Sequence, residues 1–294
     1  MERIEVLKTY KIFIGGQFPR TESGRYYPLY NKKKQMIANV SLSSRKDFRN
    51  AEVAARAAFG GWSSRTAFNR GQILYRIAEM LEGRKDQLIN ELVSLGTSRS
   101  DAKKEVLQAI DRLVYYSGWC DKFQQCFGTV NPVSSSHFNF SVPEPMGVVS
   151  IVAPEESALL GLISVIAPVI AGGNTCIVLA SEHSPLCAVT FAEVLATSDL
   201  PGGVVNILTG SSKELNDYFS NHMDVNAMIY CRKDKSEIKS IGENAALNVK
   251  RVYFWNEWDW KDDSCENPYR IMDLQEIKTT WHPVETIGGG GSKY

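Results

Sequence analysis

Apolar positions in the first half of the chain recur with the spacing of amphipathic helices. Ser44 is a suitable N-cap, and the pattern from there to Phe59 predicts a helix that ends at Gly60 and Gly61. A short strand and hairpin are expected at 12–16, where Ile-Phe-Ile precedes two glycines. Apolar stripes predict three further helices, around 73–81, 88–93 and 106–116. Stripes of this kind form core rather than cofactor sites.

From residue 147 onward the pattern changes to buried strands that alternate with helices. Strands are expected at 147–153, 175–180, 204–208, 225–230 and 249–255. Helices are expected between them, at 158–171, 184–197, 211–220 and in a segment that ends near residue 246. This alternation predicts βαβ units, and therefore an α/β fold with a doubly wound, mostly parallel sheet that follows the N-terminal helices.

Two other segments have different patterns from these units. Residues 137–142 alternate with period two, which predicts a half-exposed antiparallel strand, and residues 275–281 are also strand-like. Residues 256–269 are polar, acidic and rich in Trp, so a loop is expected there. The last segment, 284–294, contains four consecutive glycines and is expected to be a flexible tail.

Composition excludes several classes of protein. The chain has 294 residues, 44% of them apolar, and its 33 basic side chains balance its 33 acidic ones. A zero net charge argues against a nucleic acid partner, because binding to phosphates needs a basic excess or a basic face. The longest apolar run, 158–171, is shorter than the ~20 residues of a membrane span, so we expect a core helix and no membrane association.

The cysteines and histidines also lack the spacing of a metal site. Six cysteines and four histidines are scattered along the chain without a C-x-x-C pair or a zinc-type pattern. Most of the cysteines lie in apolar runs, which is typical of reduced, buried thiols, and the N-terminus has no signal-peptide core. We therefore expect a cytoplasmic protein without a metal ion.

Several segments together resemble the aldehyde dehydrogenase superfamily. They are Phe-Ile-Gly-Gly-Gln at 13–17, Ala-Ala-Arg-Ala-Ala-Phe at 54–59, Ile-Leu-Tyr-Arg-Ile-Ala at 73–78, Tyr-Tyr-Ser-Gly-Trp at 115–119, Glu-Pro-Met-Gly-Val-Val at 144–149, Ala-Gly-Gly-Asn-Thr at 171–175 and Leu-Pro-Gly-Gly-Val-Val-Asn-Ile at 200–207. Each segment is common by itself, and their order and spacing carry the resemblance.

The resemblance implies a domain organisation. Residues 1–127 and 147–256 would form the Rossmann-like cofactor-binding domain, and 128–146 with 270–283 would form the oligomerisation hairpin and the C-terminal strand that pairs with it. The family's catalytic domain, which carries its cysteine nucleophile, would lie between these parts. Only residues 256–274 are found there, too few to form a domain. The chain is therefore similar to a truncated, non-catalytic member, like the second, inactive module of two-module aldehyde dehydrogenases.

The residues that match the family's catalytic positions have the wrong chemistry. Cys265 lies in the right order for a nucleophile, but acidic neighbours raise a thiol pKa and oppose thiolate formation. Glu155 and Glu156 stand where the family has Trp-Asn, and an ionised carboxylate cannot donate to an oxyanion. Trp255 stands where the family has a general-base glutamate, and an indole cannot take a proton from water. We therefore assign no catalytic residue.

Three residues keep a weak similarity to the family's cofactor-binding positions. Glu182 matches the ribose-binding carboxylate, although the lysine of that motif is Leu179; a plain acid at a helix start is an equal alternative. Arg232 replaces a glycine of the pyrophosphate turn, which blocks close backbone approach. Arg232 and Lys233 could attract an anion by charge, or could form an ordinary solvated helix start. We expect no bound cofactor, with NAD(P) as the alternative.

These observations leave three functional hypotheses. The favoured one is a non-catalytic structural or regulatory subunit that acts through oligomerisation, with a second copy or a catalytic aldehyde dehydrogenase as its partner. The others are a nicotinamide nucleotide-binding module, and residual aldehyde dehydrogenase activity completed by a partner. Without a catalytic domain one face of the Rossmann-like sheet would be exposed, so the tryptophans near 255–260 are expected to form a partner interface or to fill the vacant nicotinamide cleft.

Overall fold

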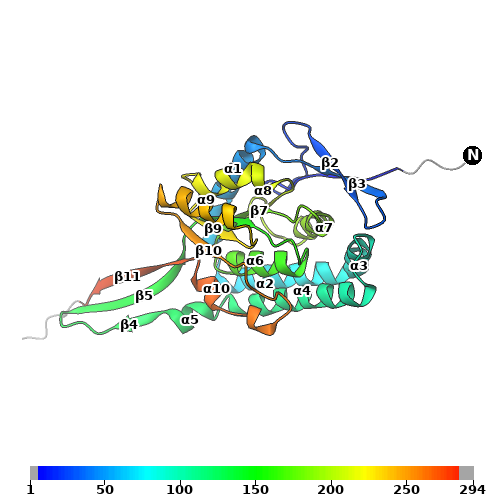
Figure 1. Cartoon of the computed structure of the whole chain (residues 1–294). Coiled ribbons are helices and arrows are strands. Elements are labelled where there is room, and N and C mark those ends of the chain that lie inside the picture. Colours follow the sequence, from blue (N-terminus) through cyan, green and yellow to red (C-terminus); the bar gives the residue numbers. More distant parts are fainter. Residues whose placement is uncertain (1–5, 285–294) are drawn as a thin grey trace, which may run out of the picture.

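The computed structural model describes residues 6–284, and its core is a five-stranded sheet with the strand order β10-β9-β6-β7-β8 (Figure 1). All neighbouring strands in it are parallel. The strands are β6 (Val148–Val152), β7 (Thr175–Leu179), β8 (Val205–Leu208), β9 (Ala227–Tyr230) and β10 (Arg251–Phe254). Each lies inside the range predicted from the sequence, so the predicted doubly wound α/β fold is confirmed.

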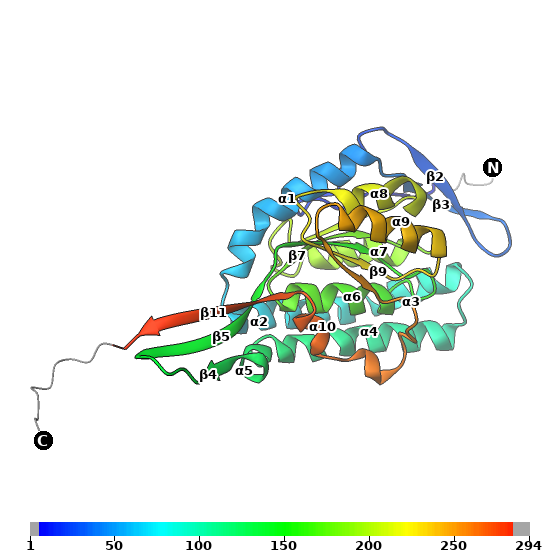
Figure 2. The same cartoon turned by 60° about the vertical axis from the view of Figure 1, so that its left-hand side comes forward.

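Helices cover both faces of this sheet. Alternate side chains of one strand enter two separate cores: Val148 and Val152 pack with helices on one face, and Val149 and Ile151 with helices on the other. Figures 1 and 2 show α1 (Arg45–Ser63), α8 (Ser212–Asn221) and α9 (Lys235–Ala246) on the first face. The second face carries α6 (Leu160–Ala171) and α7 (Leu186–Leu195).

A further helical layer lies outside α6. It consists of α2 (Ala67–Gly83), α3 (Lys85–Ser94) and α4 (Arg99–Trp119) (Figure 1). Because α6 lies between this layer and the sheet, all of its residues are buried. This explains the long apolar run in the sequence, and within residues 6–284 no helix combines the length and the apolar character needed to cross a membrane.

Two details of the N-terminal part differ from the prediction. Helix α1 continues through Gly60 and Gly61 to Ser63, because the fully buried side chain of Trp62 donates from Nε1 to the Ile170 carbonyl at 3.1 Å. That packing outweighs the roughly 1 kcal/mol by which each glycine weakens a helix.

The segment predicted as a strand and hairpin at 12–16 forms only two isolated bridges, Phe13 with Ile207 and Ile14 with Gln17. A separate small sheet, order β1-β3-β2, is formed instead by β1 (Thr9–Tyr10), β2 (Tyr26–Tyr30) and β3 (Met36–Ser41).

A three-stranded antiparallel sheet projects from the body of the molecule (Figures 1 and 2). It contains β4 (Thr129–Asn131), β5 (His137–Pro145) and β11 (Gln275–Pro283), and it follows a short helix, α5 (Phe123–Phe127). Strand β11 pairs with β5 along its whole length, from Gln275 opposite Pro145 to Pro283 opposite His137. The predicted pairing of the C-terminal strand with the hairpin is therefore confirmed. The predicted tail, 284–294, lies outside the described residues except for Val284.

Residues 256–274, which we call the strap, connect β10 to β11 and cross the outer helical layer. They contain a 3-10 turn (Asp263–Cys265) and a short helix, α10 (Tyr269–Met272). Arg112 of α4, 2% exposed, contacts Glu266 (Nε to Oε1, 3.3 Å) and donates to the Trp260 carbonyl at 3.4 Å. Tyr116 donates to the Asn267 carbonyl at 3.3 Å. The strap is thus fixed to the helices by polar contacts as well as by its apolar side chains.

Replacing Arg112 by Met tests this attachment. We expect Arg112→Met to lower the free energy of unfolding by about 1–3 kcal/mol, because it removes several hydrogen-bond donors at a buried position. Urea denaturation measures the change. Arg76→Met, at an exposed pair with Glu79 on α2, is the control and should change stability by less than about 0.5 kcal/mol. Equal losses in the two variants would show that Arg112 does not hold the strap.

Candidate functional site

The carboxyl edge of the parallel sheet has a topological switch point between β6 and β9. The chain moves from β6 to β7 on one side, whereas β9 pairs with β6 on the other side. Open parallel sheets bind their ligands outside the carboxyl ends of the strands at such a point. The segments that follow β6, β7 and β9 therefore define the candidate site, and they contribute Glu155, Glu182 and Arg232.

Arg232 joins the ends of these three strands. Its side chain is 9% exposed, and its two terminal nitrogens lie 2.7 Å from Glu155 Oε1 and 2.7 Å from Glu182 Oε1. Its Nε donates to the Ala153 carbonyl and its Nη2 to the Ala180 carbonyl, both at 3.1 Å. The guanidinium is thus engaged on all three of its nitrogens.

Glu155 accepts hydrogen bonds from the segment that follows β7 as well. Its carboxylate accepts from Ser181 Oγ at 2.6 Å and from the Glu182 amide at 3.0 Å. His183 adds its amide at 3.2 Å and its ring Nδ1 at 2.9 Å. Burial alone would raise the pKa of Glu155, but Arg232 and these donors together bring that pKa below its ordinary value. The carboxylate is therefore held in its ionised form.

The helix N-termini beside the site are also occupied by side chains. Glu182 Oε1 accepts from the amide of Ser212, the first residue of α8, at 2.7 Å. Asp234 caps α9 and accepts from the amides of Ser236 and Glu237 at 2.8 and 3.2 Å. A helix N-terminus attracts anions through free backbone amides, and here protein carboxylates take that place.

The structure brings two of the three predicted cofactor-binding residues together and leaves the third apart. Glu182 and Arg232 form an ion pair with each other, whereas Lys233 is exposed and forms no ion pair within the described part of the chain. Sequence reasoning missed the contact of Arg232 with Glu155, which was considered only as a replaced oxyanion donor. The sequence did contain a signal for this contact. Glu155 follows β6 and Arg232 follows β9, and these two strands are neighbours in the sheet, so their opposite charges could have been expected to pair.

Aromatic side chains fill the neighbouring part of the carboxyl edge, after β10. Trp255 is 4% exposed and stacks on Trp258 of the strap, with ring centroids 5.6 Å apart and planes at 14°. The Arg270 guanidinium lies over Trp255, 4.7 Å from its ring centroid, and also over Trp258. Burial lowers the pKa of Arg270 to about 10, and no hydrogen-bond acceptor within residues 6–284 contacts its nitrogens. Its charge is therefore stabilised mainly by the aromatic faces.

This packing corrects one of the two roles expected for the tryptophans. Trp255 and Trp260, which is 2% exposed, are buried by the chain itself and cannot form a partner interface. Cys265 is also buried beside them, burial raises the pKa of its thiol, and its Sγ lies 3.1 Å from the Asp259 carbonyl. The described residues contain no group of three His, Cys, Asp or Glu side chains that could hold a metal ion.

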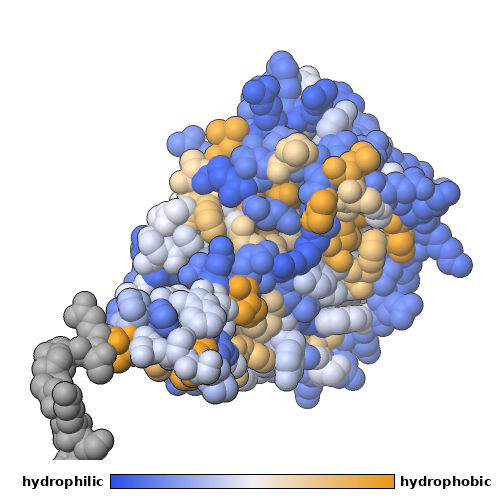
Figure 3. Space-filling view, turned by 90° about the vertical axis from the view of Figure 1, so that its left-hand side faces the viewer, coloured by the Kyte–Doolittle hydropathy of each residue, from blue (hydrophilic) through white to orange (hydrophobic). Residues whose placement is uncertain are grey.

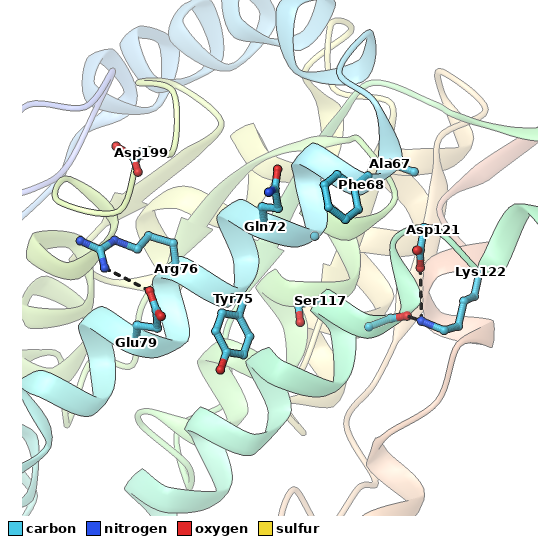
Figure 4. Close-up of a pocket in the computed structure, with 12 residues that line it drawn as sticks. Ala67, Phe68, Gln72, Tyr75, Arg76, Glu79, Ser117, Asp121, Lys122 and Asp199 are labelled. Carbon is cyan, nitrogen blue, oxygen red and sulfur yellow. Dashed lines mark hydrogen bonds and ion pairs between the residues drawn. The ribbon is translucent and has the colours of Figure 1, made fainter.

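A surface hollow lies away from this edge, on the outer helical layer (Figure 4). It has a volume of about 470 Å³ and runs between α2 and the C-terminal end of α4. Phe68 and Tyr75 of α2 line it, and the charged side chains around it include the ion pair of Arg76 with Glu79. No feature of the sequence pointed to this hollow.

Comparisons with known proteins agree with this architecture. A model of the aldehyde dehydrogenase family matches residues 19–254. The cytosolic 10-formyltetrahydrofolate dehydrogenase of Mus musculus is 34% identical over 263 residues, which cover 86% of this chain and 29% of that protein. Cytosolic aldehyde dehydrogenase 1 of Elephantulus edwardii is 32% identical over 251 residues, or 82% of this chain and 49% of the relative.

Solved structures give the same result. The NAD+ complex of an aldehyde dehydrogenase from Bacillus cereus superposes with a TM-score of 0.79 at 26% identity, and covers 83% of this chain and 50% of that one. Betaine aldehyde dehydrogenase from Staphylococcus aureus, also in complex with NAD+, has a TM-score of 0.78 at 25% identity, with 83% and 48% covered. This chain therefore spans half or less of the length of these relatives.

The parallel sheet and its switch point define an α/β protein with a Rossmann-like fold. The chain belongs to the aldehyde dehydrogenase family, and it corresponds to only a part of the length of these relatives.

Substitution of Arg232 tests how much this side chain contributes to the stability of the segments that follow β6, β7 and β9. We expect Arg232→Met to lower the free energy of unfolding by roughly 2–4 kcal/mol, because two carboxylates would then face each other without a cation. The side chains of Glu155 and Glu182 each keep a quarter or more of their surface exposed. Solvent therefore screens the two charges in part, and we expect a smaller loss of stability than for a fully buried ion pair. Lys233→Met is the matched control in urea denaturation and should be nearly neutral. A neutral Arg232→Met would contradict the assigned role.

The pH dependence of stability tests Glu155. Its folded-state pKa is depressed, so its contribution is complete above the ordinary pKa near 4.5 and is lost as the pH falls through the folded value. We expect the stability of the wild type to fall more steeply below pH 4.5 than that of Glu155→Gln. The free energy of unfolding between pH 3 and pH 7 measures the difference. Parallel curves for the two proteins would rule out an ionised Glu155 as a stabilising group.

Proposed function

We propose that this chain is a non-catalytic aldehyde dehydrogenase-like protein that acts as a structural or regulatory subunit through oligomerisation. One observation carries the proposal: the chain's own Arg232, held by Glu155 and Glu182, occupies the carboxyl edge of the sheet at the switch point. A dinucleotide there would have to displace a guanidinium with four hydrogen bonds or ion pairs, and its phosphates would meet two carboxylates.

The chemistry of the remaining positions supports the same proposal. Aldehyde oxidation needs a thiolate, an oxyanion donor and a base that activates water. The thiol of Cys265 is buried with a raised pKa, and Trp255 packs on Trp258 where the resemblance calls for a general base. Glu155, where an oxyanion donor is expected, has a lowered pKa and can only accept hydrogen bonds.

Exposed apolar side chains on the projecting sheet support the oligomerisation part of the proposal. Val130, Phe138, Ile277 and Trp281 are all exposed large hydrophobic residues of β4, β5 and β11. Figure 3 shows small hydrophobic spots on this part of the surface, among residues of intermediate hydropathy. A groove of about 360 Å³ runs along β4 and β5 beside Phe138 and Phe140. Apolar surface of this kind on a projecting element is typical of a protein interface.

Nicotinamide nucleotide binding is the second candidate, and the NAD+ complexes among the structural neighbours favour it. Residual activity completed by a partner is a weaker alternative. We also propose a cytoplasmic location, which the free cysteines and the cytosolic relatives support.

Calorimetry with NAD+, NADH and NADP+ separates these functions. We expect no heat of binding at millimolar nucleotide, because Arg232 and the strap tryptophans occupy the edge of the sheet. An aldehyde-dependent cofactor reduction assay should also give no rate with this chain alone. An intact aldehyde dehydrogenase in the same buffer is the positive control for both measurements. Saturable binding of any of the three nucleotides would favour the second candidate over the first.

The oligomeric state tests the subunit role directly. We expect native mass spectrometry to detect an assembly, either of this chain alone or of this chain with an added, purified aldehyde dehydrogenase. A monodisperse monomer that binds no such enzyme would refute the proposal.

A further inference from the structure

Strand β11 has an open edge that faces away from β5. The order of the projecting sheet is β11-β5-β4, so within residues 6–284 β11 has a neighbouring strand on one side only. The edge is nine residues long, and from Lys278 to Pro283 every side chain is exposed. A long exposed edge strand of this kind can pair with a strand of another chain.

The prolines of this sheet determine which backbone groups lie on the open edge. Pro143 and Pro145 of β5 stand opposite Ile277 and Gln275, and neither proline has an N–H to donate. These pairs are therefore the non-hydrogen-bonded ones of the β5–β11 ladder. In agreement, Val284 donates its amide to the Ser136 carbonyl at 3.0 Å, which places the even-numbered residues in the ladder. The backbone groups of the odd-numbered residues point outward.

The sequence of this edge is complementary to itself. We propose that β11 pairs with β11 of a second copy, antiparallel, about a two-fold axis through Thr279. This axis places Ile277 opposite Trp281 of the copy, and Glu276 opposite His282 of the copy. An apolar pair and a carboxylate–imidazole pair then occur twice each, as a two-fold interface requires. The proposal rests on the oligomerisation proposed above and names its strand and register.

Other two-fold registers are less favourable. An axis through Lys278 would place two lysines directly opposite each other. An axis through Thr280 would place Lys278 opposite His282, and Ile277 opposite a proline. An axis between two residues would pair outward-pointing residues with inward-pointing ones, so that the ladder could not form. Among these axes, the one through Thr279 alone engages all nine residues of the strand.

One existing contact agrees with this register. The Gln275 carbonyl, which points outward, accepts a hydrogen bond from Arg251 Nη1 at 2.8 Å. In the proposed dimer Gln275 lies opposite Pro283 of the copy, and proline has no N–H to offer that carbonyl. The Arg251 contact is therefore retained on dimerisation. The two copies together would form a continuous six-stranded antiparallel sheet, β4-β5-β11 followed by its symmetry mate.

Single-cysteine variants test the register. In a Cys126→Ser background, which removes the exposed native thiol, Thr279→Cys should form an intermolecular disulfide under mild oxidation. Directly opposite residues at a two-fold axis have Cα atoms about 5.5 Å apart, within disulfide range. Lys278→Cys and Thr280→Cys are the matched controls and should remain monomeric on non-reducing gels. Efficient cross-linking of either control would overturn the register, since it would place the axis at a different residue.

A backbone substitution gives a second, independent readout. Thr279→Pro removes an outward N–H without removing a bond of the β5 ladder, so sedimentation velocity should detect a loss of dimer. Thr279→Val, which keeps the N–H, should retain the dimer. Circular dichroism verifies that both variants are folded, and if Thr279→Pro is unfolded the cysteine series decides alone.

The same experiments separate this inference from the proposed function. A wild-type dimer without Thr279 cross-linking refutes the β11 pairing but leaves oligomerisation standing. A wild-type monomer also refutes it, and binding to a purified intact aldehyde dehydrogenase then decides whether the subunit role survives. A dimer that cross-links only at Thr279 and binds no nucleotide supports both the β11 pairing and the proposed function as a non-catalytic subunit.

Discussion

The ion pairs of Arg232 hold together the carboxyl edge of the parallel sheet, where open sheets of this kind bind their ligands. One guanidinium connects the segments after β6, β7 and β9, and two carboxylates and two backbone carbonyls surround it. Partly buried charges of this kind are stable only when every partner is present, because each alone would carry a desolvation cost. The carboxyl edge is therefore organised around a side chain of the protein itself, and the capped N-termini of α8 and α9 reinforce that arrangement.

The strap also places the protein's own side chains at the carboxyl edge of the sheet, in the part that follows β10. Trp255, Trp258 and Arg270 form an aromatic and cationic stack, and Arg112 and Tyr116 of α4 fix the strap on its other side. Residues 256–274 are thus fixed both to the aromatic stack after β10 and to α4. By contrast, several large apolar side chains of the projecting sheet remain exposed.

Most of the fold was predictable because local patterns determined it. The strands from β6 to β10 are short apolar runs between helices, and their parallel orientation follows from the helical connections between successive strands. The end of α1 was predicted wrongly because glycines suggested a stop, whereas the burial of Trp62 depends on contacts distant in sequence. The candidate site was predicted in part: Glu182 and Arg232 were identified, but their mutual contact and the role of Glu155 depend on which strands are neighbours. The position of the tryptophans depended on the path of the strap, which has no periodic pattern.

The pairing of β11 with β5 has a consequence for synthesis of the chain. The two strands meet with Gln275 opposite Pro145, so β5 leaves the ribosome well before its partner exists. At ordinary translation rates this delay is on the order of ten seconds, far longer than the folding of a hairpin takes. During that time β5 has a free edge and carries the exposed aromatic side chain of Phe138, so this segment of the nascent chain needs protection from aggregation.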